Sequence, residues 1–192
     1  MVRLILLLIA LVAPTVAMAH PGHVEATGFL AGAEHPFTGL DHVVVMIAVG
    51  LWAALKGGRA LWIWPLAFVV VMLAGGALGM AHVPLPFVEP AILASVVVLG
   101  LMVTFAVDLP VWLGAAIIGA FALFHGHAHG FEAPENVGGV EYMAGFALAT
   151  ATLHGLGIAI ALSLKSARMQ PLVRVAGAAC VLIGVSLVAK LV

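Results

Sequence analysis

Hydrophobic residues fill the chain in six long runs, separated by short polar or glycine-rich breaks. Each run has about twenty residues, the length that an α-helix needs to cross the hydrocarbon core of a bilayer. Backbone groups in lipid must be paired within their own segment, so we expect each run to be a helix. The predicted helices are Pro36–Leu55, Leu61–Met80, Val88–Val107, Val111–Gly130, Val140–Leu164 and Leu172–Leu191. We therefore predict an all-α, polytopic membrane helix bundle with six transmembrane helices.

The first nineteen residues show a different pattern, that of a cleavable signal peptide. Arg3 precedes a short apolar core, Leu4–Val12, and the segment ends on the small-residue motif Ala17-Met18-Ala19. This core is too short for a comfortable membrane span, although an uncleaved anchor helix is the alternative. The predicted organisation is a signal peptide at 1–19, a periplasmic histidine-containing segment at 20–35 and the six-helix transmembrane domain at 36–192.

Composition agrees with a membrane protein and excludes other classes. Hydrophobic residues make up 65% of the chain and charged residues 8%, and the mean hydropathy is +1.27, far outside the range of soluble proteins. Seven Lys and Arg against eight Asp and Glu leave no basic surplus, so we expect no nucleic-acid partner. The single cysteine, Cys180, cannot form an internal disulfide.

The positive charges predict an orientation. With the mature N-terminus outside, the outer side holds only Lys190, whereas the inner side collects five basic residues. These are Lys56, Arg59, Lys165, Arg168 and Arg174. Cytoplasmic loops of membrane proteins are enriched in Lys and Arg in this way. We therefore expect a multi-pass protein of the bacterial inner membrane whose mature N- and C-termini are both periplasmic.

Two imidazoles and a carboxylate, His35, Asp41 and His42, stand at the start of the first predicted helix, where charge is costly unless it is used. Pro36 suits a first helical turn, so the helix is predicted to begin at or just after His35. Seven helical residues separate the two histidines by roughly 10 Å, too far for one ion. Either the backbone breaks around Thr38-Gly39 and brings them together, or an ion passes from one to the other. In a purely structural alternative, Asp41 stabilises the first turn and the histidines lie at the lipid headgroups.

A histidine-rich run, His125, His127 and His129, ends the fourth predicted helix. His125 and His129 are one turn apart on one face, the spacing with which a helix offers two imidazoles to one metal, whereas His127 points away. The chain has nine histidines, and such clustering is typical of transition-metal handling. The alternative is a run of histidines that face water.

Other residues extend this candidate site. His154 falls near the bilayer midplane in the fifth predicted helix, either as an inner relay or as a core histidine bonded to a backbone carbonyl. His20 and His23 begin the mature chain, where the α-amine and imidazoles form either a metal collector or a tail with incidental histidines. Three methionines either line a path or pack in the core. They are Met46, Met72 and Met102. The Gly75-x-x-x-Gly79 motif indicates close packing of helices in the bundle, and a homodimer face is the alternative interpretation.

The motifs together resemble those of a known family. The signal peptide, the mature start His20-Pro21-Gly22-His23, the His35-x5-Asp41-His42 element and the Phe124–Gly130 run are similar to the HupE/UreJ family of nickel permeases. These are membrane accessory proteins of hydrogenase and urease, and the resemblance covers essentially the whole chain. It implies uptake of Ni²⁺, or in some members Co²⁺, without an ATP-hydrolysing subunit in the same chain. It assigns ligand roles to His35, Asp41, His42, His125, His127 and Glu132.

Our first hypothesis is therefore a divalent-metal permease that is not an enzyme. Its substrate is Ni²⁺ or Co²⁺, it carries no prosthetic group, and its partners are the metal ion and the lipid bilayer, with a homo-oligomer left open. Imidazole and carboxylate also suit Zn²⁺ and Cu²⁺, so the donors do not choose the metal. The runner-up is an intramembrane zinc hydrolase, and a bis-histidine haem protein is third. The hydrolase would bind zinc through Asp41, His42, His125 and His154.

Overall fold

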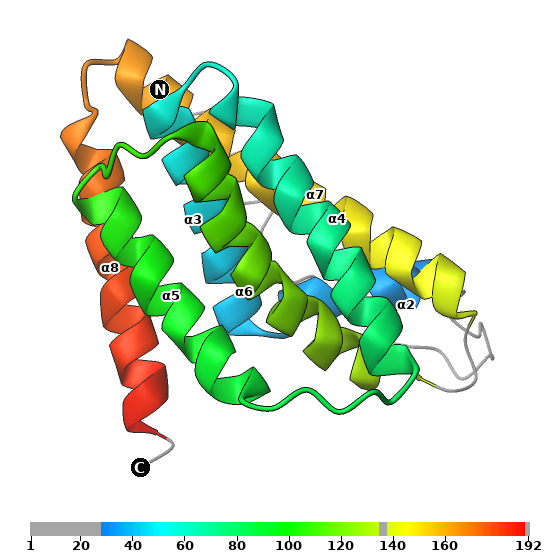
Figure 1. The fold of residues 1–192 in the computed structure, drawn as a ribbon. Helices are drawn as coiled ribbons and strands as arrows, with labels where there is room; N and C mark the ends of the chain where they lie inside the picture. The colour runs from blue at the N-terminus through cyan, green and yellow to red at the C-terminus, as the bar shows by residue number, and fades with distance from the viewer. Residues whose placement is uncertain (1–27, 135–137, 191–192) are drawn as a thin grey trace, which may run out of the picture.

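A computed structural model describes residues 28–134 and 138–190, and all regular secondary structure in these ranges is helical (Figure 1). The elements are α2 (Gly28–Glu34), the single-turn 3₁₀ helix η1 (His35–Phe37), α3 (Leu40–Lys56), α4 (Ala60–Met80), α5 (Val88–Thr104), α6 (Val111–Phe131), α7 (Gly139–Ser166) and α8 (Pro171–Ala189). The predicted all-α class is confirmed for this part of the chain. The predicted signal peptide and the candidate ligands His20 and His23 lie outside the described residues.

The six predicted helices correspond to α3 through α8, with ends that differ by a few residues. Four of them, α4, α6, α7 and α8, are long and apolar enough to cross a membrane. Helix α3 meets the same test only together with α2–η1, as a pair bent by 81°, and α5 is a shorter apolar helix of 17 residues. The chain therefore has the character of a multi-helix membrane protein, and the count of six spans stays a prediction.

The start of the first predicted helix differs from the prediction. The chain forms α2, which the sequence pattern did not predict, then the single turn of η1, and begins α3 only at Leu40. Pro36 has no N–H to continue the hydrogen bonds of α2, and Gly39 is extended, with φ −101° and ψ 115°. The prediction of a continuous helix from His35 is wrong, and the backbone breaks at Thr38-Gly39, as the alternative required.

Helix α3 lies at the centre of the bundle, in contact with α4, α5, α7 and α8 (Figure 1). Eleven of its 17 residues are buried, from His42 near its start to Ala54 near its end. A helix that is apolar on all sides is expected to lie inside a bundle. This central position carries His42 at the start of α3 into the interior.

Glycines allow α4 and α6 to pack backbone against backbone. A Cβ atom at Gly75 would lie 2.2 Å from the carbonyl oxygen of Leu123, and one at Gly126 would lie 2.0 Å from that of Met72. Real Cβ atoms do not approach so closely, so only glycine permits this separation. Gly79 makes a similar contact with α6. The motif of Gly75 and Gly79 therefore serves packing within the chain, as predicted, rather than a homodimer face.

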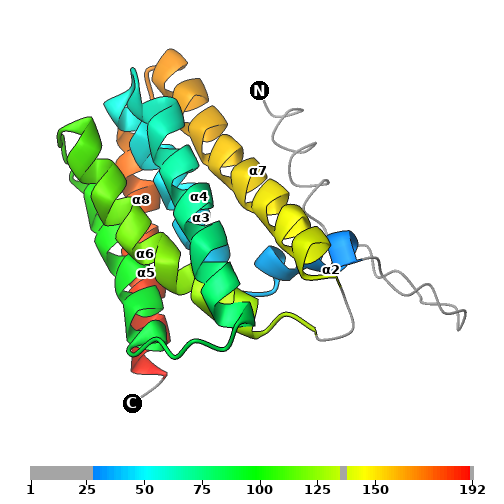
Figure 2. The same ribbon diagram turned by 45° about the vertical axis from the view of Figure 1, so that its right-hand side comes forward.

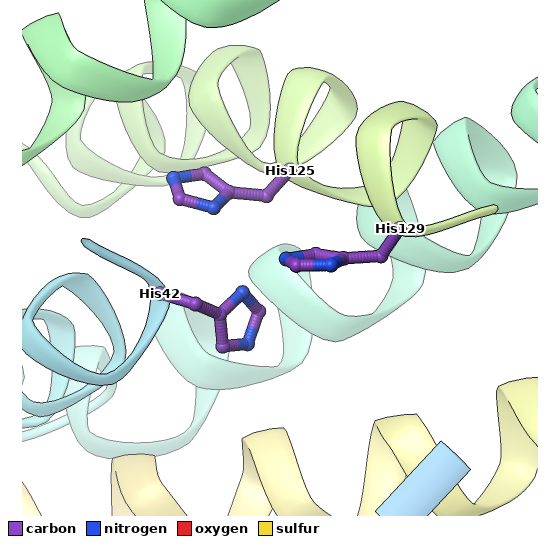
Figure 3. Close-up of side chains that lie close together, drawn as sticks. All are labelled: His42, His125 and His129. Carbon is purple, nitrogen blue, oxygen red and sulfur yellow. The ribbon is translucent and has the colours of Figure 1, made fainter. Parts of the chain in front are cut away.

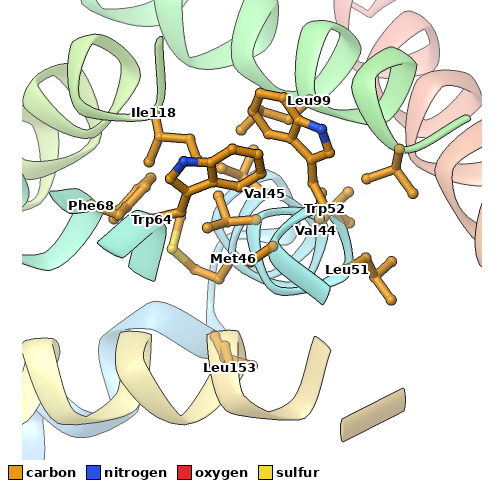
Figure 4. Packing of buried hydrophobic residues seen from close by; sticks show 14 of the residues in the cluster. Val44, Val45, Met46, Leu51, Trp52, Trp64, Phe68, Leu99, Ile118 and Leu153 are labelled. Atoms are coloured by element: carbon orange, nitrogen blue, oxygen red, sulfur yellow. The ribbon is translucent and has the colours of Figure 1, made fainter. Parts of the chain in front are cut away.

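Large apolar side chains fill the half of the bundle beyond His42 (Figure 4). The ring centroids of Trp52 and Trp64 are 4.2 Å apart. The indole N–H of Trp52 donates to the carbonyl oxygen of Val107, within the α5–α6 connection, at 2.8 Å. That of Trp64 donates to the carbonyl oxygen of Val111, the first residue of α6, at 2.9 Å. Trp52 is ten residues, roughly 15 Å, along α3 from His42. Met46 is fully buried in this cluster. Of the two roles considered for it, lining a path and packing in the core, its position corresponds to packing.

Basic residues gather at the end of the bundle opposite the histidines. They stand at the C-terminal ends of α3 and α7, at the N-terminal ends of α4 and α8, and in the connections between these helices. Two of them are tied to the α5–α6 side of the same end: Lys56 pairs with Asp108, and Arg174 donates to the carbonyl oxygen of Thr104 at 2.7 Å. Among the described Lys and Arg, only Lys190 lies at the histidine end. The charge asymmetry behind the predicted orientation is therefore a property of the folded bundle.

The contact between α3 and α7 can be tested with two glycines of α7. A Cβ at Gly157 would lie 2.3 Å from the carbonyl oxygen of Ile47, whereas one at Gly155 meets nothing within 4 Å. We expect Gly157→Ala to lower the free energy of unfolding by about 1–3 kcal/mol, because the added methyl group overpacks the contact. The unfolding midpoint in detergent, measured by tryptophan fluorescence, should fall accordingly. Gly155→Ala should leave the midpoint unchanged or raise it, because alanine favours helix and can increase the free energy of unfolding by up to about 1 kcal/mol. Equal midpoints would contradict the close packing of α3 and α7.

Candidate metal centre

Three side chains from two separate segments form what we name the rim cluster: His35, His129 and Glu132. His35 Nε2 lies 2.9 Å from His129 Nδ1 and 3.1 Å from Glu132 Oε2, and the third side, from His129 Nδ1 to Glu132 Oε2, is 3.4 Å. Metal–ligand bonds of about 2.0–2.2 Å place neighbouring ligand atoms roughly 3 Å apart. The three atoms therefore have the spacing of one face of a coordination polyhedron.

The backbone break after α2 is what brings His35 to this cluster. Helix α2 lies across the beginning of α7 (Figure 2), so closely that a Cβ at Gly32 would lie 1.9 Å from the carbonyl oxygen of Tyr142. His35 follows directly in η1, on the same side as the C-terminal end of α6, which carries His129 and Glu132. The hydrogen bond with His129 lowers the pKa of the Glu132 carboxyl below its ordinary value, and His35 lowers it further. Glu132 is therefore an ionised acceptor at neutral pH.

A second group, which we name the interior cluster, consists of His42, His125 and His129. Each ring offers one nitrogen, and these nitrogens lie within 4.8 Å of one another. Figure 3 shows the three rings converging, with His42 on α3 and the other two one turn apart on α6. His42 and His125 have no exposed surface, and His129 is buried. The predicted sharing of one face by His125 and His129 is confirmed.

His129 belongs to both clusters. Its Nδ1 is the atom within hydrogen-bond distance of His35, which leaves Nε2 for the interior cluster. Side-chain exposure falls from 54% at Glu132 through 25% at His35 to 11% at His129, and His42 is fully buried. The donor atoms thus form a continuous series from the surface into the bundle.

The interior cluster is enclosed by hydroxyl groups and aromatic rings. His42 Nε2 lies 3.2 Å from Thr150 Oγ1, and His125 Nε2 lies 2.9 Å from Ser95 Oγ. Phe146 packs against both His42 and His129, with ring centroids 5.0 and 4.8 Å apart. Sequence reasoning missed Ser95 and Phe146, because no spacing relates them to the histidines and both residue types are common in membrane helices.

Asp41 lies beside these clusters without joining either of them. Its Oδ1 accepts a hydrogen bond from the backbone N–H of His42 at 2.7 Å, in the first turn of α3. This is the contact that the structural alternative predicted for Asp41, a carboxylate that stabilises a helix start. The ligand role that the family resemblance implies for Asp41 stays a prediction.

His127 and His154 take separate positions. His127 Nε2 donates to the carbonyl oxygen of Val83 in the α4–α5 connection at 2.7 Å, so this ring points away from the clusters, as predicted from its spacing. Its ligand role by resemblance also stays a prediction. His154 is buried against Phe68, whose ring also contacts His125. Neither ring nitrogen of His154 has a hydrogen-bond partner among the described residues, so the carbonyl-bonded alternative is not observed there.

The zinc site of the hydrolase alternative is not assembled in the described part of the chain. That site required Asp41, His42, His125 and His154 to meet at one ion. Among the residues described, His42 and His125 group with His129 instead, and neither Asp41 nor His154 belongs to a group of potential ligands. The donors present are imidazoles and one carboxylate, the ligand types that suit divalent transition metals.

The sequence matches one protein family along most of its length. The family model described as HupE / UreJ protein matches residues 7–187. Protein HupE from Rhizobium leguminosarum bv. viciae is 50% identical over 181 residues, which cover 94% of each chain. No solved structure matches the chain. Since the family model spans nearly the whole sequence, including every residue of both clusters, the chain belongs to the HupE/UreJ family.

Proposed function

We propose that this protein is an ATP-independent permease that takes up Ni²⁺, or Co²⁺, across the bacterial inner membrane and supplies it for hydrogenase or urease maturation. The observation that carries the proposal is the pair of ligand clusters joined at His129, which leads from an exposed carboxylate to fully buried imidazoles. Ionisable groups inside a membrane bundle mark ion pathways by default. Family membership supports the same conclusion.

The rim cluster has the chemistry of an entry site. Glu132 provides a negative charge that attracts a hydrated cation, and the imidazoles of His35 and His129 replace part of its water shell. Three protein ligands leave the remaining positions to water, so the ion is not enclosed in a rigid cage. A transport site must bind strongly enough to dehydrate the ion and weakly enough to release it.

Transfer to the interior cluster exchanges ligands around one fixed ring. A neutral imidazole has a single lone pair and one N–H, so His129 coordinates through one nitrogen at a time. The ion leaves His35 and Glu132 as it gains His42 and His125, and the N–H proton of His129 passes from Nε2 to Nδ1 as the coordinating nitrogen changes. The two clusters are therefore occupied in turn rather than together.

Inward movement beyond the interior cluster uses His154 as the next donor, across the ring of Phe68. An inside-negative potential contributes about 2.3 kcal/mol per charge per 100 mV, so a divalent ion gains roughly 4.6 kcal/mol. This driving force makes ATP hydrolysis unnecessary. In the same proposal, His20 and His23 collect metal at the mature N-terminus, and both termini are periplasmic.

Metal accumulation tests the proposal directly. Cells that express His42→Ala should accumulate radioactive nickel at least about ten-fold more slowly than cells with the unchanged protein, because the interior cluster loses one of its three ligands. His82→Ala is the matched control, since His82 is exposed in the α4–α5 connection and should leave uptake unchanged. The permease proposal fails if nickel and cobalt accumulation is the same with and without the protein. A Soret absorption band in the purified protein would instead indicate haem.

The proposed orientation predicts where fused reporters are active. Alkaline phosphatase folds only outside the cytoplasm, so a fusion after Val192 should be active and a fusion after Gly58 inactive. A green fluorescent protein fused at the same two positions should give the opposite pattern. Activity of the phosphatase after Gly58 would place the basic end of the bundle outside and refute the orientation.

A further inference from the structure

The hydrogen bonds around Ser95 determine which nitrogen of His125 carries the proton. Ser95 Oγ donates its only proton to the carbonyl oxygen of Ile92, 2.5 Å away on the same helix. The lone pairs of Ser95 Oγ then face His125 Nε2 at 2.9 Å, so Nε2 must be the donor of that second hydrogen bond. A neutral imidazole has one N–H. His125 Nδ1 is therefore the nitrogen with the free lone pair.

The same arrangement occurs at His42. Thr150 Oγ1 donates to the thioether sulfur of Met72 at 3.6 Å, and a thioether can only accept. The hydroxyl oxygen of Thr150 lies 3.2 Å from His42 Nε2, which must therefore carry the proton that this contact needs. His42 is held as the Nε2–H tautomer, and its Nδ1 lone pair is free.

Both of these Nδ1 atoms are buried and have no hydrogen-bond partner among the described residues. A buried polar atom without a partner costs roughly 1–3 kcal/mol, so two such atoms in one cluster are unfavourable unless a ligand satisfies them. Both rings belong to the interior cluster, where nitrogens of three histidines lie within 4.8 Å of one another. In Figure 3 a nitrogen of each ring faces the space between the rings.

We propose that Thr150 and Ser95 are positioning residues that fix the tautomers of His42 and His125, so that the Nδ1 atoms of both rings bind the divalent cation. Metal-binding histidines nearly always donate their other N–H to an oxygen, which fixes the ring and its tautomer. The identity of the cation rests on the proposed function, whereas the tautomers do not. Neutral hydroxyls raise the basicity of an imidazole less than carboxylates do, which favours the exchangeable binding that transport needs.

The first test is metal affinity in the purified full-length protein. Thr150→Val keeps the shape of the side chain and removes the hydroxyl, and Ser95→Ala does the same at α5. Each should weaken Ni²⁺ binding, measured by competition with a chelator, by roughly ten- to a hundred-fold. Thr150→Ser retains the hydroxyl and should restore the affinity. Loss of affinity in Thr150→Ser as large as in Thr150→Val would overturn the proposal, since the hydroxyl would then not be the group that matters.

Two matched controls use exposed hydroxyls that bond only to their own helix. Thr152 donates to the carbonyl oxygen of Leu148 at 2.8 Å, and Ser186 donates to that of Ile183 at 2.7 Å. Thr152→Val and Ser186→Ala should leave Ni²⁺ affinity unchanged. If either of them weakens binding as much as its partner variant, the effect is one of general stability and the proposal fails.

The second test reads the tautomers in metal-free protein by nitrogen NMR with isotopically labelled histidine Nδ1. The signals of His42 and His125, assigned by their loss in His42→Ala and His125→Ala, should be of the unprotonated type. Thr150→Val should move the His42 signal toward the protonated type, and Ser95→Ala should do so for His125. Protonated Nδ1 in the unchanged protein, or signals that do not move in these variants, would refute the assignment. Unprotonated Nδ1 signals and hydroxyl-dependent Ni²⁺ affinity without nickel uptake would support it and refute only the permease.

Discussion

The structure depends on how a bundle of apolar helices can bury imidazole rings. An ionised group in such an interior costs several kcal/mol, so the rings are neutral, and each then has one N–H and one lone pair to satisfy. For His42 and His125 the N–H groups are satisfied by hydroxyls of neighbouring helices, and the lone pairs are left facing one another. A divalent cation could satisfy these lone pairs by accepting them as ligands. The lone pairs whose burial destabilises the metal-free protein are therefore the same ones that could bind a cation.

Close approach of backbones supplies the geometry that this arrangement needs. Gly75 and Gly126 hold α4 against α6, the helix that carries two of the three interior histidines, and Gly157 holds α7 against α3. The second contact sets the distance between Thr150 on α7 and His42 on α3. These glycines therefore support the site indirectly, because they set the spacing of the helices that carry its side chains.

The sequence predicted the features that local pattern determines. Helices α3 to α8 followed from the length of the apolar runs, and the common face of the α6 histidines followed from their spacing. Helix α2 was missed because seven residues are too few to show a helical period. The contacts of Ser95 and Phe146 with the histidines were missed because they join residues that are distant in sequence, and a single sequence carries no record of such contacts. The break at Thr38-Gly39 was predicted only as one of two alternatives. A continuous helix would hold His35 and His42 too far apart to share an ion, so either the backbone breaks or the ion passes from one histidine to the other.

The packing of Trp52 against Trp64 has a consequence for how an ion could pass through the bundle. These fully buried rings and their apolar neighbours lie between the histidines and the basic end of the bundle. Passage of an ion to the basic end, as the proposed function requires, would therefore need α3 to move relative to α4 at these rings.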